Sequence, residues 1–123
     1  MALDESARCI TIPATADLSA SQFKLIKRTA GLAVTTTAGT DVVIGPLQNK
    51  PLLGLSAEVA IDGVALAMVG AVVADGAQLM SDGSGRAITA TSSNRAFGIA
   101  MAAGAAAGDI IPVLVNVTRP LIA

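Results

Sequence analysis

The side chains able to do chemistry are few and scattered. Histidine, the commonest general base and metal ligand near neutral pH, is absent from the chain. Cys9 is the single cysteine, so it can form no disulfide within the chain, and as a nucleophile it has no imidazole to activate it. We therefore expect a buried or idle thiol and assembly in a reducing cytoplasm.

The carboxylates offer two pairs for acid–base work, Asp4 with Glu5 and Asp75 with Asp82. Both pairs stand in arm or turn sequence, where solvated acidic residues are usual. Asp82-Gly-Ser-Gly resembles the start of a calcium or phosphate loop, but the remaining ligands and a following Gly-Lys-Ser/Thr are missing. The sequence predicts a turn there, and no catalytic residue, metal site, cofactor or small-molecule substrate.

Charge and hydropathy argue against nucleic acids and membranes. The 8 basic and 9 acidic residues give a net charge of −1, and only Lys24, Lys27 and Arg28 cluster, so no basic stripe exists to neutralise phosphates. The most apolar stretches, 63–74 and 96–108, fall short of the about 20 residues that a spanning helix needs. The acidic N-terminus leads into no signal-peptide stretch. We expect a soluble protein without a targeting signal.

The elements that must position these residues are short β-strands. Turn signals recur every few residues, which is typical of an all-β sandwich or barrel of antiparallel strands. The expected strands are 9–13, 23–29, 33–36, 41–44, 57–61, 64–69, 77–80, 87–90, 96–100 and 110–117. Asp62-Gly63 favours a type I′ turn joining two of them as a hairpin. At most one short helix is expected, at 100–107 or beginning near Asp17.

The chain is expected to form a single β domain, residues 10–123, preceded by an arm, residues 1–9. Gly31-Leu-Ala-Val-Thr-Thr-Thr recurs as Gly85-Arg-Ala-Ile-Thr-Ala-Thr, which predicts two copies of one β unit at about 31–61 and 85–115. Chance similarity in an Ala/Gly/Thr-rich chain is the alternative. The composition is 53% hydrophobic but only 2% aromatic, so each buried side chain is small and a partner is expected to add stability.

Several segments together resemble a known family. They are Ile44-Gly-Pro-Leu-Gln-Asn-Lys-Pro, Asp75-Gly-Ala-Gln-Leu-Met-Ser-Asp-Gly-Ser-Gly-Arg-Ala-Ile, Phe97-Gly-Ile-Ala and Gly108-Asp-Ile-Ile-Pro-Val-Leu-Val. Their order and spacing are similar to those of the tailed-phage capsid cement, or head-decoration, proteins, once a domain-of-unknown-function family. The resemblance implies a compact β-tulip fold, no catalytic residue and attachment to the outside of a capsid. Pro46 stands where the family often has Val, which suggests an edge or a bulge.

The resemblance also implies partners and a location. The expected partner is the major capsid protein, the expected assembly a homotrimer, and the expected place the capsid surface of a virion, after synthesis in the host bacterial cytoplasm. For the contact with the capsid we consider Leu3, Arg8, Ile10 and Ile12, which would lie on the capsid surface. One way to make this contact is to add a strand to an exposed sheet edge. The competing interpretation, in which Ile10 and Ile12 form the first core strand, stays open.

A second class of function is a small β ligand-binding or carrier module. A carrier needs an exposed lysine at a hairpin tip, and Lys50, before Pro51, is the only lysine in a plausible loop. The residues that usually flank such a lysine are missing. Sugar-binding modules present aromatic platforms, which this sequence lacks.

Overall fold

The structure, a computed structural model, describes residues 8–14, 16–38, 41–91 and 96–115, and within them every regular element is a β-strand. The strands are β1 (Arg8–Pro13), β2 (Leu25–Thr29), β3 (Leu32–Thr35), β4 (Gly45–Pro46), β5 (Ser56–Met68), β6 (Gln78–Ser81), β7 (Ala87–Thr89), β8 (Gly98–Ala100) and β9 (Ile110–Val115). The all-β prediction is confirmed. Residues 100–107, considered for one short helix, form bends and a turn instead, and Gly104 bridges to Val73. In the described part, no helix could span a membrane.

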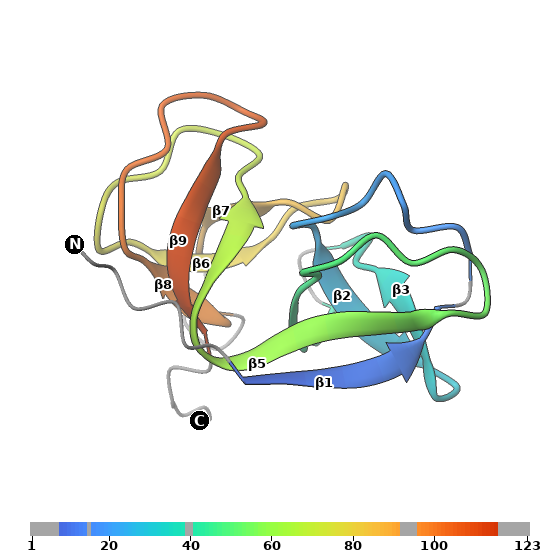
Figure 1. Cartoon of the computed structure of the whole chain (residues 1–123). Helices are drawn as coiled ribbons and strands as arrows, with labels where there is room; N and C mark the ends of the chain where they lie inside the picture. Colours follow the sequence, from blue (N-terminus) through green and yellow to red (C-terminus); the bar gives the residue numbers. More distant parts are fainter. Residues whose placement is uncertain (1–7, 15, 39–40, 92–95, 116–123) are drawn as a thin grey trace.

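The strands form two antiparallel sheets. One has the order β1-β5-β9-β8-β6-β7 and the other the order β3-β2-β4. Figure 1 shows β5 as a long bent strand that runs from the group formed by β1, β2 and β3 into the group formed by β6, β7, β8 and β9. The edge position of β4 suits Pro46, which has no N–H for a further ladder. The expected strand at 41–44 is irregular, and only Gly45–Pro46 pairs.

The hairpin predicted at Asp62-Gly63 is wrong, because β5 continues through both residues. A type I′ turn needs positive φ at both central positions, but positive φ occurs at Gly63 (87°) and not at Asp62. The strand changes partners at this point: residues up to Asp62 pair with β1, and residues from Gly63 pair with β9. The glycine therefore bends the strand without ending it.

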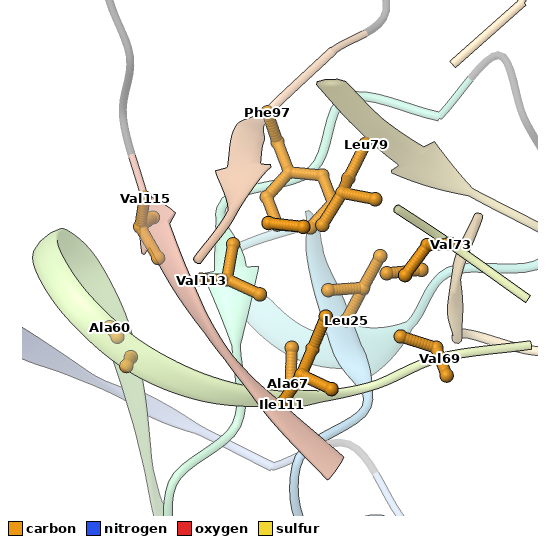
Figure 2. Packing of buried hydrophobic residues seen from close by; sticks show 13 residues of the cluster. Leu25, Ala60, Ala67, Val69, Val73, Leu79, Phe97, Ile111, Val113 and Val115 are labelled. Atoms are coloured by element: carbon orange, nitrogen blue, oxygen red, sulfur yellow. The ribbon is translucent and has the colours of Figure 1, made fainter. Parts of the chain in front are cut away.

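The bend divides the molecule into two halves. The first half comprises β1 to β4 with residues 56–62 of β5, and the second comprises residues 63–68 of β5 with β6 to β9. The first core contains Ile12, Ala14, Leu18, Ile26, Ala33, Leu47, Ala57 and Val59. The second core is larger and gathers around Phe97, with Leu25, Ala60, Ala65, Ala67, Val69, Val73, Leu79, Ala87, Ala100, Ile111, Val113 and Val115 (Figure 2).

The two halves share one pattern of strand pairing. In the first half β2 pairs with β3 and β4, and in the second β6 pairs with β7 and β8. Three cross-strand residue pairs of the first half each have a counterpart in the second half. Ile26–Gly45 corresponds to Leu79–Gly98, Ile26–Thr35 to Leu79–Thr89, and Ile10–Val59 to Ala65–Val113. Corresponding residues lie 53 to 55 positions apart. The two β units expected at about 31–61 and 85–115 stay a prediction, and this shared pairing is the observation that bears on it.

Hydrogen bonds across the middle join the halves into one body. The backbone N–H of Leu25 donates to the carbonyl oxygen of Gly85 at 2.6 Å. The Ser81 hydroxyl donates to the Thr36 hydroxyl, also at 2.6 Å, and both groups are buried. Since a buried hydroxyl is costly unless it is paired, this contact fixes how β6 meets the end of β3.

Candidate capsid-contact surface

β1 carries three of the four residues proposed for contact with a capsid. Arg8 and Ile10 are exposed, whereas Ile12 is 4% exposed and belongs to the first core. Leu3 lies outside the described residues. The two interpretations therefore each hold for part of β1: Arg8 and Ile10 are exposed, whereas Ile12 belongs to the first core.

The backbone of β1 forms one edge of the six-stranded sheet. It pairs with β5 on one side only, and a register shift separates Arg8 from Cys9. An edge strand presents unpaired N–H and C=O groups, to which an extended segment of another chain can pair. Beyond Pro13, which has no N–H, Ala14 bridges to Ala33 of β3, so the open stretch is short.

Cys9 lies on this edge and is exposed, so the expectation of a buried thiol is wrong. Partial desolvation, and to a smaller extent the carboxylate of Glu58 on the neighbouring strand, raise the pKa of the Cys9 thiol above its ordinary value. A protonated thiol is a poor nucleophile. The environment of Cys9 is that of an idle side chain.

The acidic residues considered for chemistry have structural contacts instead. Asp82 accepts hydrogen bonds from the backbone N–H groups of Ser84 (2.8 Å) and Arg86 (2.9 Å), as expected for a turn. Its second oxygen lies 3.5 Å from Nε of Arg86. Asp75 is exposed, and Asp4 and Glu5 lie outside the described residues. Among residues that the structure describes, no group of three or more His, Cys, Asp or Glu side chains could hold a metal ion.

A second surface feature escaped the sequence analysis. Leu52, Leu53 and Leu55 are exposed in the connection between β4 and β5, which we call the leucine turn (residues 51–55). The signal was present, since an apolar run between Pro51 and Gly54 falls in turn sequence rather than in a strand. Lys50, considered for a carrier function, begins the same connection and is not at the tip of a tight hairpin.

Comparison with known proteins identifies the family. The family model described as "Phage cement protein" matches residues 5–117. The chain belongs to this phage cement protein family. The family is one of structural proteins of the phage particle, in agreement with the resemblance seen in the sequence. No curated protein matches the chain.

A solved structure shares the fold of this cement-family chain. It is the crystal structure of the head fiber gp8.5 N base in bacteriophage phi29, with a TM-score of 0.67 and 12% sequence identity. The match covers 88% of this chain and 92% of that chain. The similarity therefore extends over both halves and both cores, and at this identity it concerns the fold.

Proposed function

We propose that this chain binds the outer surface of an assembled phage capsid and stabilises it, without catalysing a reaction. The observation that carries the proposal is the cement-family match over residues 5–117. The rigid body formed by two hydrogen-bonded halves supports it, as does the presence of a phage head fiber base among proteins of the same fold. The proposed location is the capsid surface of the virion, after synthesis in the bacterial cytoplasm.

The proposed mechanism is thermodynamic linkage. A protein that binds the assembled shell, but not the separated subunits, stabilises the shell by mass action. At a free concentration 100 times the Kd, each occupied site contributes about 2.7 kcal/mol. Because one shell presents many copies of each site, modest contributions accumulate over the particle. The partner in this proposal is the major capsid protein.

The experiment compares undecorated heads of the phage that encodes this chain, with and without the purified protein. The chain is expected to co-sediment with expanded heads, to leave free capsid subunits unbound, and to raise the temperature at which heads release their contents. An unrelated β protein of similar size serves as the control. Heads that neither bind the chain nor gain thermal stability would contradict the proposal.

We further propose that the chain acts as a homotrimer. Leu32, Met101 and Ile110 are among the large hydrophobic side chains exposed in the described part, and they are apolar surface that self-association would cover. Light scattering over a range of concentrations, in solution and after release from heads, measures the assembly. A monomer under every condition would contradict this part of the proposal.

The contact through the N-terminal arm is also a proposal. Arg8 and Ile10 offer exposed side chains, the edge of β1 offers backbone groups, and Leu3 would extend the contact. Ile12 would contribute through its backbone only, since its side chain is buried. Deleting residues 1 to 8 is expected to weaken binding to undecorated heads while leaving the cores intact. Unaltered affinity would remove the arm from the contact.

A further inference from the structure

The leucine turn exposes an unusual amount of apolar surface for its length. The exposed fractions are 53% for Leu52, 67% for Leu53 and 57% for Leu55. Gly54 between them has a φ of 82°, and a Cβ placed there would meet no atom within 4 Å. The turn is therefore open to solvent at Gly54, and the leucines on either side of that glycine are exposed.

The second half contains a counterpart of this turn, at residues 104–109. Four backbone hydrogen bonds of the first turn have a counterpart in the second. In the first turn the N–H groups of Ala14, Gly54, Leu18 and Leu55 donate to the carbonyl oxygens of Leu55, Ala14, Pro51 and Leu52, respectively. In the second turn, in the same order, the N–H groups of Val69, Gly108, Val73 and Asp109 donate to the carbonyl oxygens of Asp109, Val69, Gly104 and Ala106. Gly108 has a φ of 94°, matching Gly54. The second turn is one residue longer, and otherwise the backbone design is the same.

The side chains on the two turns differ completely. Ala106 and Ala107 stand where the first turn has Leu52 and Leu53, and Asp109 stands where it has Leu55. The Asp109 carboxylate accepts hydrogen bonds from two backbone N–H groups of its own turn. One chain thus builds the same turn once without any leucine and once with three. The fold does not require the leucines, and a solvated turn is better made with the residues of the second half.

The leucine turn lies away from the ends of the described chain. Arg8 pairs with Asp62, and Val115 pairs with Gly63, so both ends leave the body at the bend of β5. The turn precedes Ser56 at the other end of the first part of β5, about 20 Å away at roughly 3.3 Å per residue. The leucine turn therefore lies beside Ala14, at the opposite end of β1 from Arg8.

The area of the turn argues against a second copy of the chain as its occupant. Three leucines exposed to this degree present on the order of 200 Å² of apolar surface. Two copies meeting turn to turn would bury on the order of 400 Å², far below the roughly 1,200 Å² of a specific protein interface. A small group of apolar side chains can still supply most of the binding energy when it fills a pocket at the centre of a larger contact.

We propose that the leucine turn is an apolar anchor that inserts into a hydrophobic recess of the shell protein. This inference rests on the proposed capsid binding and names the part of the chain that carries it. The larger contact is supplied by the shell surface around the recess. The second half, whose corresponding turn is small and polar, does not make the equivalent contact.

The test transplants the side chains of the second turn onto the first. The variant L52A/L53A/L55D is expected to bind undecorated heads at least about 100-fold more weakly than the unaltered chain, with an unchanged Tm. V42A/V72A is the matched control, since it removes two exposed apolar side chains elsewhere, and it should bind as the unaltered chain does. Adding A106L/A107L to the triple variant restores exposed leucines on the wrong turn and should not rescue binding.

The outcomes separate this inference from the proposed function. If the unaltered chain and the triple variant bind heads equally well, the anchor is refuted and the proposed capsid binding is not. Unaltered chain that does not bind refutes both. Weakened binding accompanied by a changed mass in light scattering assigns the turn to self-association and refutes the shell as its occupant. Should the triple variant fold poorly, L53A alone must weaken binding at an unchanged Tm, or the anchor is refuted.

Discussion

Gly45 and Gly98 are corresponding residues whose missing side chains allow strands to approach closely. A Cβ added at Gly45 would overlap the carbonyl oxygen of Ala60, and one added at Gly98 would overlap the carbonyl oxygen of Leu114. Both obstacles are backbone atoms of the strand that follows, so no side-chain rotation can relieve them. Substituting alanine must move one strand away from its neighbour.

The expected magnitude follows from that displacement. Forcing a methyl group into a packed strand contact costs typically 1–3 kcal/mol, and here the overlap with fixed backbone places Gly45→Ala and Gly98→Ala at about 3 kcal/mol or more. Gly54→Ala and Gly108→Ala are the matched controls, because a Cβ at either site meets nothing within 4 Å. Their positive φ alone costs about 1–2 kcal/mol.

The assay is equilibrium unfolding in urea, followed by circular dichroism, for the four single variants and the unaltered chain. Gly45→Ala and Gly98→Ala are expected to have a much lower free energy of unfolding than the controls Gly54→Ala and Gly108→Ala. The two close-contact variants should resemble each other in stability, and so should the two controls. A native stability of about 5–15 kcal/mol leaves room to measure these differences. Equal losses for Gly45→Ala and Gly54→Ala would refute the argument that strand approach, rather than backbone conformation, determines these positions.

Three further predictions concern the second core, a turn and the thiol. Phe97→Ala removes one of the chain's two aromatic side chains from a buried cluster and should lower the free energy of unfolding by about 3 kcal/mol, measured by thermal denaturation against the Phe23→Leu variant. The hydrogen bond from the N–H of Thr37 lowers the pKa of Asp41 most, followed by hydrogen bonds from the Lys27 side chain and the N–H of Ala38. The contribution of Asp41 to stability is therefore present above pH 3.8 and is lost as the pH falls through the lower folded value. Asp41→Asn should make the free energy of unfolding depend less on pH over that acid range, and an unchanged pH dependence would contradict the assignment to Asp41. Because its pKa is raised, Cys9 should react slowly with iodoacetamide at pH 7 and faster above pH 9, whereas rapid labelling at neutral pH would show an activated thiol.

Much of the fold was predictable because strand signals here are local. β1, β2, β3, β6, β7 and β9 lie within one or two residues of their expected ranges, since turn residues bound each apolar alternation. Asp62-Gly63 misled because its turn preference is a local property, whereas continuous pairing of β5 with β1 and then β9 is determined by tertiary contacts. The Ala-rich stretch at 100–107 has helix propensity, but bridge pairing of Gly104 with Val73 decides its conformation.

The surface was less predictable than the fold. Ile10 and Ile12 stand two positions apart and so share one face of β1, yet Ile10 is exposed and Ile12 is buried. Only the structure shows how far along the strand the core covers that face. The leucine turn was missed although Pro51 and Gly54 mark its leucines as turn residues, because the exposure of an apolar run also depends on what packs over it. Its meaning emerged from comparison with the second half, whose counterpart was visible only after the strand registers had been matched.

The continuity of β5 has a mechanical consequence. Where two domains are joined by a linker, the linker bends before either domain does, and relative motion is the default. Here the boundary between the halves falls inside a strand, at Gly63, and the extended backbone on either side of it is held in a ladder by β1 and by β9. A load applied at the leucine turn therefore passes along one continuous, hydrogen-bonded strand, through its bend, into the second half. Between the two halves β5 has no irregular segment that could take up strain, which suits the proposed role as a shape-holding part on a capsid.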